Sequence, residues 1–181
     1  MQKLTQESFQ QIIDTAPMKP RIKREVRFTT SVAHLDDESW ERTEVLPITD
    51  RSGNRGVLLF QAEAGLMYAT SYEISRGITS STGKAQPIIC DFCRTWQTGS
   101  RSGSVTLQKP GRDTGSISFL CCADLECSKH VRNLTAASRT SRSQLREDLD
   151  NDQRIARLKQ RLIEVSTILG LTPIALEPTD L

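Results

Sequence analysis

Cys90-Asp91-Phe92-Cys93 and Cys121-Cys122-Ala123-Asp124-Leu125-Glu126-Cys127 are the two stretches that decide the fold, because they hold all five cysteines of the chain. A two-residue spacer lets a tight turn direct both sulfurs of a pair to one point. Two close pairs of thiols about thirty residues apart therefore suit a single tetrahedral metal ion, and zinc is the ion we expect.

Two short β-compatible runs lie between the cysteine pairs, at residues 104–108 and 116–120, and the glycine-containing segment 109–115 joins them. This pattern predicts a β-hairpin whose second strand leads into Cys122. Segment 123–134 begins with acidic residues and ends with basic ones, as a helix dipole prefers, so Cys127 should lie in the opening turns of a helix. The order of knuckle, hairpin and helix is that of a treble-clef zinc finger.

At these residues the chain resembles a known family. The Cys-x-x-Cys pair, the glycine-rich interval and the run Cys-Ala-Asp-Leu-x-Cys-Ser at 122–128 are similar to the treble-clef zinc domain of elongation-factor-G-binding proteins, the group of the fusidic acid resistance proteins. The resemblance is sharp over residues 86–134, weak as far as residue 155 and faint upstream. It implies a structural Zn²⁺ and a partner, elongation factor G, on or near the ribosome. The ligands that it implies are Cys90, Cys93, Cys122 and Cys127.

The stretch before the zinc segment is too short for the N-terminal helical bundle of the resistance proteins. The resemblance therefore implies the zinc fold and leaves resistance itself as a separate question.

The adjacent residues Cys121 and Cys122 compete for one ligand position. Cys121 falls at the end of the predicted strand and should point away from Cys122. The four-residue spacer to Cys127 and the family pattern both favour Cys122. Cys121 is then expected to be a small buried apolar residue.

Two chemical alternatives compete with structural zinc. A redox dithiol at Cys90 and Cys93 would normally open a helix in a thioredoxin-like unit, whereas glycines and a hairpin follow here. A catalytic zinc needs an open coordination position and usually a base, but His34 and His130 form no deaminase motif, and Glu126 fits better as an acid at a helix start. Four thiolates close the site, so we expect a binding protein and not an enzyme.

Composition and charge set wider limits. The 181 residues are 36% hydrophobic and 25% charged, enough for one core or for a core with a small metal-stabilised lobe. No apolar run of about eighteen residues and no signal peptide are present, so we expect a soluble cytoplasmic protein without a membrane partner or small-molecule substrate. Residues 90–161 hold thirteen basic and eight acidic side chains, and this excess of +5 suggests RNA or an acidic protein surface as partner.

The candidates for contact with a partner are aromatic and basic side chains of the zinc segment. Phe92, between two ligands, is either an exposed anchor or a cap on the small core of the lobe. The full set is Phe92, Arg94, Trp96, Arg101, Lys109, Arg112, Lys129 and Arg132.

The N-terminal half predicts a small antiparallel sheet with helices. An amphipathic helix capped at Thr5 or Ser8 should end before Pro17 and Pro20, and a strand is expected near residues 26–30, beside a basic cluster at 19–27. An acidic surface turn at 36–41 should precede strands at 43–48, 56–61 and 66–74. The first of these should be an edge strand, because it contains Pro47.

The last long element is an amphipathic helix that begins near Asp150 and ends at Gly170, with an apolar seam that should pack on the sheet. Residues 76–86 are the expected linker, and residues 135–143 the expected connector. The fold class is therefore α+β: a small antiparallel sheet with helices, then a treble-clef zinc finger and a C-terminal helix. The expected domains are 1–85, 86–140 and 141–181.

Two functions follow. The first is a zinc-containing binding protein that docks to elongation factor G or the ribosome and modulates release of the factor. The alternative is a zinc-finger module that binds RNA or DNA directly, which a steep loss of affinity with rising salt would reveal.

Overall fold

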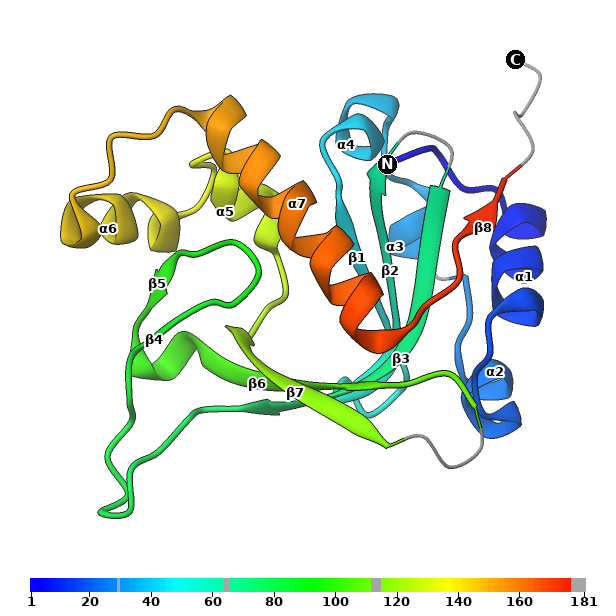
Figure 1. The fold of residues 1–181 in the computed structure, drawn as a ribbon, viewed down its shortest axis with the longest axis horizontal. Coiled ribbons are helices and arrows are strands. Elements are labelled where there is room, and N and C mark those ends of the chain that lie inside the picture. The colour runs from blue at the N-terminus through cyan, green and yellow to red at the C-terminus, as the bar shows by residue number, and fades with distance from the viewer. Residues whose placement is uncertain (29, 64–65, 112–114, 177–181) are drawn as a thin grey trace.

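An antiparallel sheet forms the centre of the computed structural model (Figure 1), which describes residues 1–28, 30–63, 66–111 and 115–176. Five strands follow the order β1-β2-β3-β6-β7, and the short β8 pairs with one end of β3. Their bounds are β1 Val45–Thr49, β2 Arg55–Glu63, β3 Leu66–Arg76, β6 Ser102–Gln108, β7 Ser116–Cys122 and β8 Ile174–Ala175. The strands expected at 43–48, 56–61 and 66–74 are confirmed, and β1 lies at the edge as Pro47 predicts.

Helices lie on both sides of the sheet. Figure 1 shows β1, β2 and β3 between α7 and α1. Two short strands, β4 Ile88–Ile89 and β5 Trp96–Gln97, pair with each other beside the main sheet, and a 3₁₀ turn spans Gly99–Arg101. The helices are α1 Gln6–Thr15, α2 Pro20–Glu25, α3 Thr30–Ala33, α4 Asp37–Glu41, α5 Cys127–Val131, α6 Ala136–Leu145 and α7 Asn151–Leu169.

Alternating side chains of the sheet point to opposite faces and pack in two separate hydrophobic cores. In β2, Leu58 and Phe60 belong to one core, whereas Val57 and Leu59 belong to the other. The first core includes the five cysteines and the α7 seam of Leu158, Leu162, Val165 and Leu169, as the sequence predicted. The second core is filled by α1 and α4.

The long helices begin and end at the capping residues that the sequence indicates. Thr5 caps α1, and Asp150 caps α7 by accepting a hydrogen bond from the Gln153 amide at 2.8 Å. Gly170 ends α7 with a φ of 69°, a left-handed conformation that favours glycine.

Three N-terminal and central predictions are wrong. No strand forms at residues 26–28, where one was expected: these residues follow α2, which begins with Pro20 at the first helical position, where its missing N–H costs nothing. The expected acidic surface turn is α4, whose cap is Asp36 and whose Trp40 is 2% exposed. The expected connector 135–143 is α6, which begins with a Thr135/Ser138 capping box.

The strands on the two sides of residue 85 are hydrogen-bonded neighbours. Tyr72 to Arg76 of β3 pair with Gly103 to Leu107 of β6, so one sheet crosses the expected boundary between the first two domains. The expected linker 76–86 forms a loop that extends from the body, with a single bridge between Thr79 and Ala85 (Figure 1). Within the described ranges, no helix has the length and apolar character that crossing a membrane requires.

Candidate metal centre

The first ligand pair lies in a tight turn between β4 and β5. The Cys90 amide donates to the Thr95 carbonyl at 2.9 Å, and the Arg94 amide donates to the Cys90 carbonyl at 3.0 Å. Arg94 has a φ of 59°, which folds the chain back immediately after Cys93. This knuckle turns both sulfurs toward the same side.

The second pair joins the hairpin to a helix. Cys122 is the last residue of β7, and Cys127 is the first residue of α5. Between them, Leu125 has a φ of 56° and its amide donates to the Cys122 carbonyl at 3.0 Å. The Asp124 carboxylate accepts from the Glu126 amide at 3.0 Å. This turn brings the start of the helix to the end of the strand, and the predicted hairpin and helix are both confirmed.

Four sulfurs converge at this point. The Sγ atoms of Cys90, Cys93, Cys122 and Cys127 all lie within 4.8 Å of one another, and each cysteine is at most 1% exposed. The Cys90–Cys127 sulfur separation is 3.9 Å, and the Cys93–Cys122 separation is 3.4 Å. A tetrahedral zinc with Zn–S bonds of about 2.3 Å requires sulfurs roughly 3.8 Å apart. The cluster therefore fits one zinc ion.

The electrostatics of the four thiols also call for a cation. Contact with the Cys122 thiol, and then with those of Cys90 and Cys93, raises the pKa of Cys127 well above its ordinary value, and burial acts in the same direction. A divalent ion supplies the positive charge that lets neighbouring buried thiols ionise. Metal binding at this site therefore releases protons.

Two buried polar side chains surround the sulfurs, and sequence reasoning missed both. The Thr95 hydroxyl lies 2.8 Å from the Cys93 sulfur, and the Gln97 amide nitrogen lies 3.4 Å from the Cys122 sulfur. The Gln97 amide also donates to Thr95 at 2.9 Å. Gln97 and Thr95 are 0% and 1% exposed. Donors of this kind orient thiolates and moderate their charge.

His130 connects the ligand turn to the next helix. Its Nε2 lies 3.2 Å from the Asp124 carboxylate, and its Nδ1 lies 2.7 Å from the Thr135 hydroxyl that caps α6. His130, Asp124 and Cys122 are also close enough to share an ion. Because Cys122 already belongs to the group of four sulfurs, the closed tetrahedral set is the better metal site, and His130 braces the turn around it.

Cys121 is excluded from the sulfur group although it is adjacent to a ligand. It is 0% exposed and belongs to the core, where Gly103 lies opposite it in the β6–β7 register. Burial raises the pKa of the Cys121 thiol. Glu126, considered above as a base, forms an ion pair with Lys129 at 2.5 Å.

Two of the predicted partner contacts are held by internal packing or pairing. Phe92 is 2% exposed and its ring packs against Phe119 at 5.5 Å, so it caps the core and is not an exposed anchor. Arg132 is held by two 2.7 Å hydrogen bonds to the buried Glu44, so its guanidinium is committed to an internal ion pair.

The other predicted contacts are spread over several surface hollows. Trp96 and Arg101 line one hollow together with α6, while Arg94 lines another with Arg157 and Arg161. Lys109 lies near the start of α2, and Lys129 lies on α5. Arg112 lies outside the described residues.

The knuckle, the hairpin and the helix that begins with the last ligand define a Cys₄ treble-clef zinc-binding domain, in which the Zn²⁺ is structural. Residues 20–167 match the family model of the FBP C-terminal treble-clef zinc-finger, so the chain belongs to this family. At the family level it is a zinc-binding protein of the elongation-factor-G-binding type. The match extends well upstream of residues 86–134, where the sequence resemblance was sharp, and includes most of the sheet. No curated protein and no solved structure matched the chain.

Proposed function

We propose that the protein docks on elongation factor G, alone or on the ribosome, and modulates release of the factor, with the zinc lobe as the docking surface. The match over residues 20–167 carries this proposal, because it covers the zinc site and the sheet that supports it. The expected cytoplasmic location agrees with such a partner.

The closed ligand set supports a role in binding and not in catalysis. Four buried sulfurs leave no open coordination position where a substrate or an activated water could bind. The ion then acts by shaping the lobe, so that a surface residue keeps the geometry that a partner recognises.

The hollow between the knuckle and α6 is the part of the lobe best suited to docking. It encloses about 310 Å³ and is lined by Trp96, Arg101 and residues of α6. Trp96 is half-buried, and its backbone amide donates to the buried Ser141 hydroxyl at 2.8 Å, which holds the chain at this residue against α6. Tryptophan and arginine are enriched among the residues that dominate protein–protein binding, and an exposed arginine suits an acidic partner surface.

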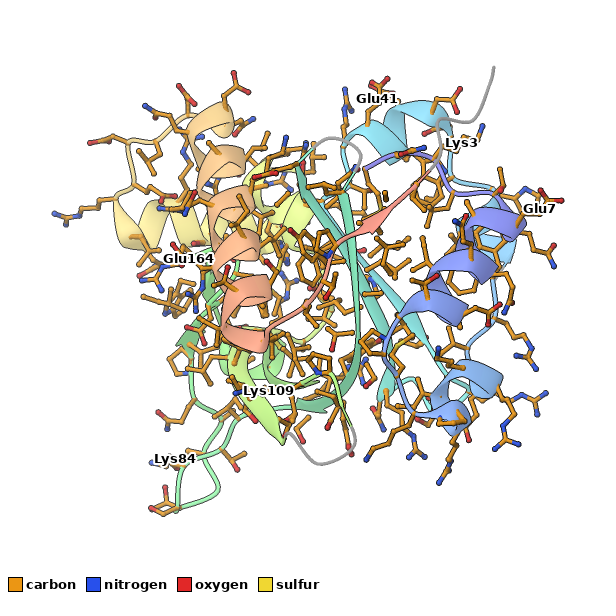
Figure 2. All side chains as sticks on the ribbon, turned by 45° about the vertical axis from the view of Figure 1, so that its right-hand side comes forward. Lys3, Glu7, Glu41, Lys84, Lys109 and Glu164 are labelled. Atoms are coloured by element: carbon orange, nitrogen blue, oxygen red, sulfur yellow. The ribbon has the colours of Figure 1, made fainter. Side chains whose placement is uncertain are left out.

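The test is isothermal titration calorimetry of the zinc-loaded protein with purified elongation factor G. We expect Arg101→Glu and Trp96→Ala to weaken binding at least about tenfold. Lys84→Glu, on the extended loop (Figure 2), is the charge-matched control and should leave the affinity unchanged. Absence of binding by the wild-type protein would overturn the proposal. If the control variant weakened binding of elongation factor G equally, the docking surface would not be the hollow beside Trp96.

A functional readout follows from the same proposal. If docking speeds release of the factor, the zinc-loaded protein should raise factor turnover on ribosomes stalled with fusidic acid, and Arg101→Glu should reduce that effect. An unchanged turnover would limit the protein to binding without release.

The second candidate is direct binding of RNA or DNA by the zinc lobe, favoured by the +5 charge of residues 90–161. It predicts binding of nucleic acid without the factor, with an affinity that falls steeply as salt rises and that Arg101→Glu reduces.

A further inference from the structure

A second concentration of positive charge lies outside the zinc lobe. Segment 19–27 contains five basic side chains and one acid, and segment 50–55 adds two arginines and one aspartate. Residues 1–89 hold eleven basic and eleven acidic side chains in all. Outside these two segments they therefore keep only four basic residues against nine acids. The N-terminal half is neutral in total but strongly polarised.

The fold brings the two segments together. α2 and the turn between β1 and β2 line one cavity of about 450 Å³. Figure 2 shows nitrogen-tipped side chains gathered around α2, away from Glu7 on α1. The lining residues are Arg24, Glu25, Arg27, Asp50, Arg51, Ser52 and Arg55. We call this surface the arginine corner.

The two acidic residues of the arginine corner form ion pairs with two arginines, and the other arginines of the corner keep their charge unpaired within the described residues. Glu25 pairs with Arg21 at 2.8 Å, and Asp50 pairs with Arg55 at 2.9 Å. Arg24, Arg27 and Arg51 are exposed, and in the described parts of the chain none of them forms an ion pair. Three guanidinium groups thus face one hollow without a neutralising carboxylate.

The turn that carries Arg51 is well fixed. The Asp50 carboxylate accepts hydrogen bonds from the Ser52 amide at 2.9 Å and from the Ser52 hydroxyl at 2.5 Å. The Asp50 amide donates to the Arg55 carbonyl at 2.7 Å. A preorganised turn loses less entropy on binding than a mobile one, so the corner is better suited to a specific ligand than a scatter of surface charges.

We propose that the arginine corner binds the phosphate backbone of RNA, a contact separate from the docking of the zinc lobe on a protein partner. The planar guanidinium forms paired hydrogen bonds with phosphate oxygens, which an ammonium cannot. Among the described residues, no aromatic side chain lines the cavity, so the corner offers no ring on which a base could stack. The contact would therefore recognise the phosphate backbone and not the base sequence.

The composition of the corner disfavours the other polyanions. The exposed large hydrophobic residues within the described ranges are Ile89, Leu120, Leu134, Leu145 and Ile168, and all lie outside the corner, so it offers no side chain for insertion into a lipid surface. An acidic protein would need a packed apolar or aromatic centre for affinity, and the described residues that line the cavity include no such side chain.

The test measures fluorescence anisotropy of a labelled 20-nucleotide oligouridylate with the full zinc-loaded chain between 50 and 200 mM salt. For single strands, the slope of log K against log salt is about −0.7 per neutralised phosphate. The triple variant Arg24→Gln, Arg27→Gln, Arg51→Gln should therefore lower the magnitude of the slope by about 2 and weaken binding roughly a hundredfold at 0.1 M salt. All three side chains are exposed, so zinc content and thermal unfolding should not change.

The matched control removes three exposed positive charges outside both the corner and the zinc lobe, through Lys3→Gln, Arg42→Gln and Lys84→Gln, and should keep the wild-type slope. A wild-type protein that does not bind the oligonucleotide overturns the proposal, as does a control triple that weakens binding as much as the corner triple. Polyglutamate or phosphatidylserine vesicles competing as well as oligouridylate, at equal charge concentration, would assign the corner to an acidic protein or a lipid surface instead.

Discussion

On one face of the sheet, α1 and α4 cover Val57, Leu59 and Met67 with hydrophobic side chains such as Phe9 and Trp40. On the other face, α7 contributes a similar hydrophobic seam, but the elements beside it are held by four sulfurs. The two faces share the same strands and differ in what holds their outer layer in place.

The size of the elements explains the difference. On the zinc side, β4 and β5 have two residues each and α5 has five. Such short pieces are unstable on their own, because a hairpin or a single helical turn buries too little to offset its ordering. A metal ion supplies the missing free energy at one point. On the other face, the ten-residue α1 has a buried apolar stripe and needs no ion.

Removal of one ligand should give the largest effect. Cys122→Ser removes a thiolate from the closed set, and structural zinc contributes about 10–16 kcal/mol in small zinc domains, as much as the whole stability of a typical domain. We expect the purified variant to contain less than stoichiometric zinc by elemental analysis and to lose its cooperative thermal transition.

The control for that variant is Cys121→Ala, one residue away. Cys121 is buried outside the sulfur group, so this change should keep full zinc content and cost only about 1 kcal/mol. Equal loss of zinc in both variants would show that the ligand assignment is wrong.

The largest effect on the metal-free face should come from Trp40→Ala. The indole is 2% exposed in the second core, and truncation of a buried tryptophan costs about 3–5 kcal/mol. Urea unfolding should measure this loss while zinc stays bound at one equivalent in the folded protein. If the variant lost zinc before it unfolded, the packing of the second core and the zinc site would not be independent of each other.

The buried pair of Glu44 and Arg132 links the start of β1 to the end of α5, and Glu44→Gln should cost about 3 kcal/mol. The carboxylate before β1 accepts two hydrogen bonds from Arg132, next to α5, so the change leaves a poorly accessible guanidinium without its counter-charge. Chemical denaturation measures the loss. Glu38→Gln, which breaks the exposed pair with Arg42, is the control and should cost less than about 0.5 kcal/mol.

A double variant sharpens that result. Glu44→Gln combined with Arg132→Met removes both charges, so it should recover part of the loss. A double variant as unstable as the sum of the two single changes would show that the pair is not coupled.

The smallest expected effect concerns metal affinity alone. Gln97→Leu removes the amide that lies 3.4 Å from the Cys122 sulfur, and loss of such an outer contact typically weakens metal binding about 10–100-fold. Competition with a chelator should measure this change. The control is Thr98→Val, an exposed neighbour, which should not change the metal affinity. An unchanged metal affinity in Gln97→Leu would show that Gln97 does not support the metal site.

The elements that were predictable from the sequence have strong local signals. Cysteine spacing identified the ligands, the apolar seam with Asp150 and Gly170 identified α7, and alternating runs identified the strands. The helix α6 was missed because its buried face is made of Ala137, Ser138 and Ser141, which look like a polar connector in a sequence. Small side chains pack closely against β5, but they give no hydrophobic periodicity.

The remaining misses depend on contacts distant in sequence. Arg132 looked like a surface charge because its partner Glu44 lies 88 residues away. Phe92 could be placed only once Phe119 was known to face it. Gln97 could not be found from the sequence, because its role depends on the Cys122 sulfur, which lies 25 residues away in the chain and 3.4 Å from the Gln97 amide nitrogen.

The pairing of Leu66 and Met67 in β3 with Ile174 and Ala175 in β8 has a consequence for synthesis. During translation, that end of β3 stays uncovered until residues 174–175 have emerged from the exit tunnel, long after the cysteines have become free to take up metal. The zinc lobe can therefore mature while the nascent chain is still attached, and the hydrophobic face beside α1 is completed last. The last strand edge of this chain to be paired is therefore at Leu66 and Met67, and not at the metal site.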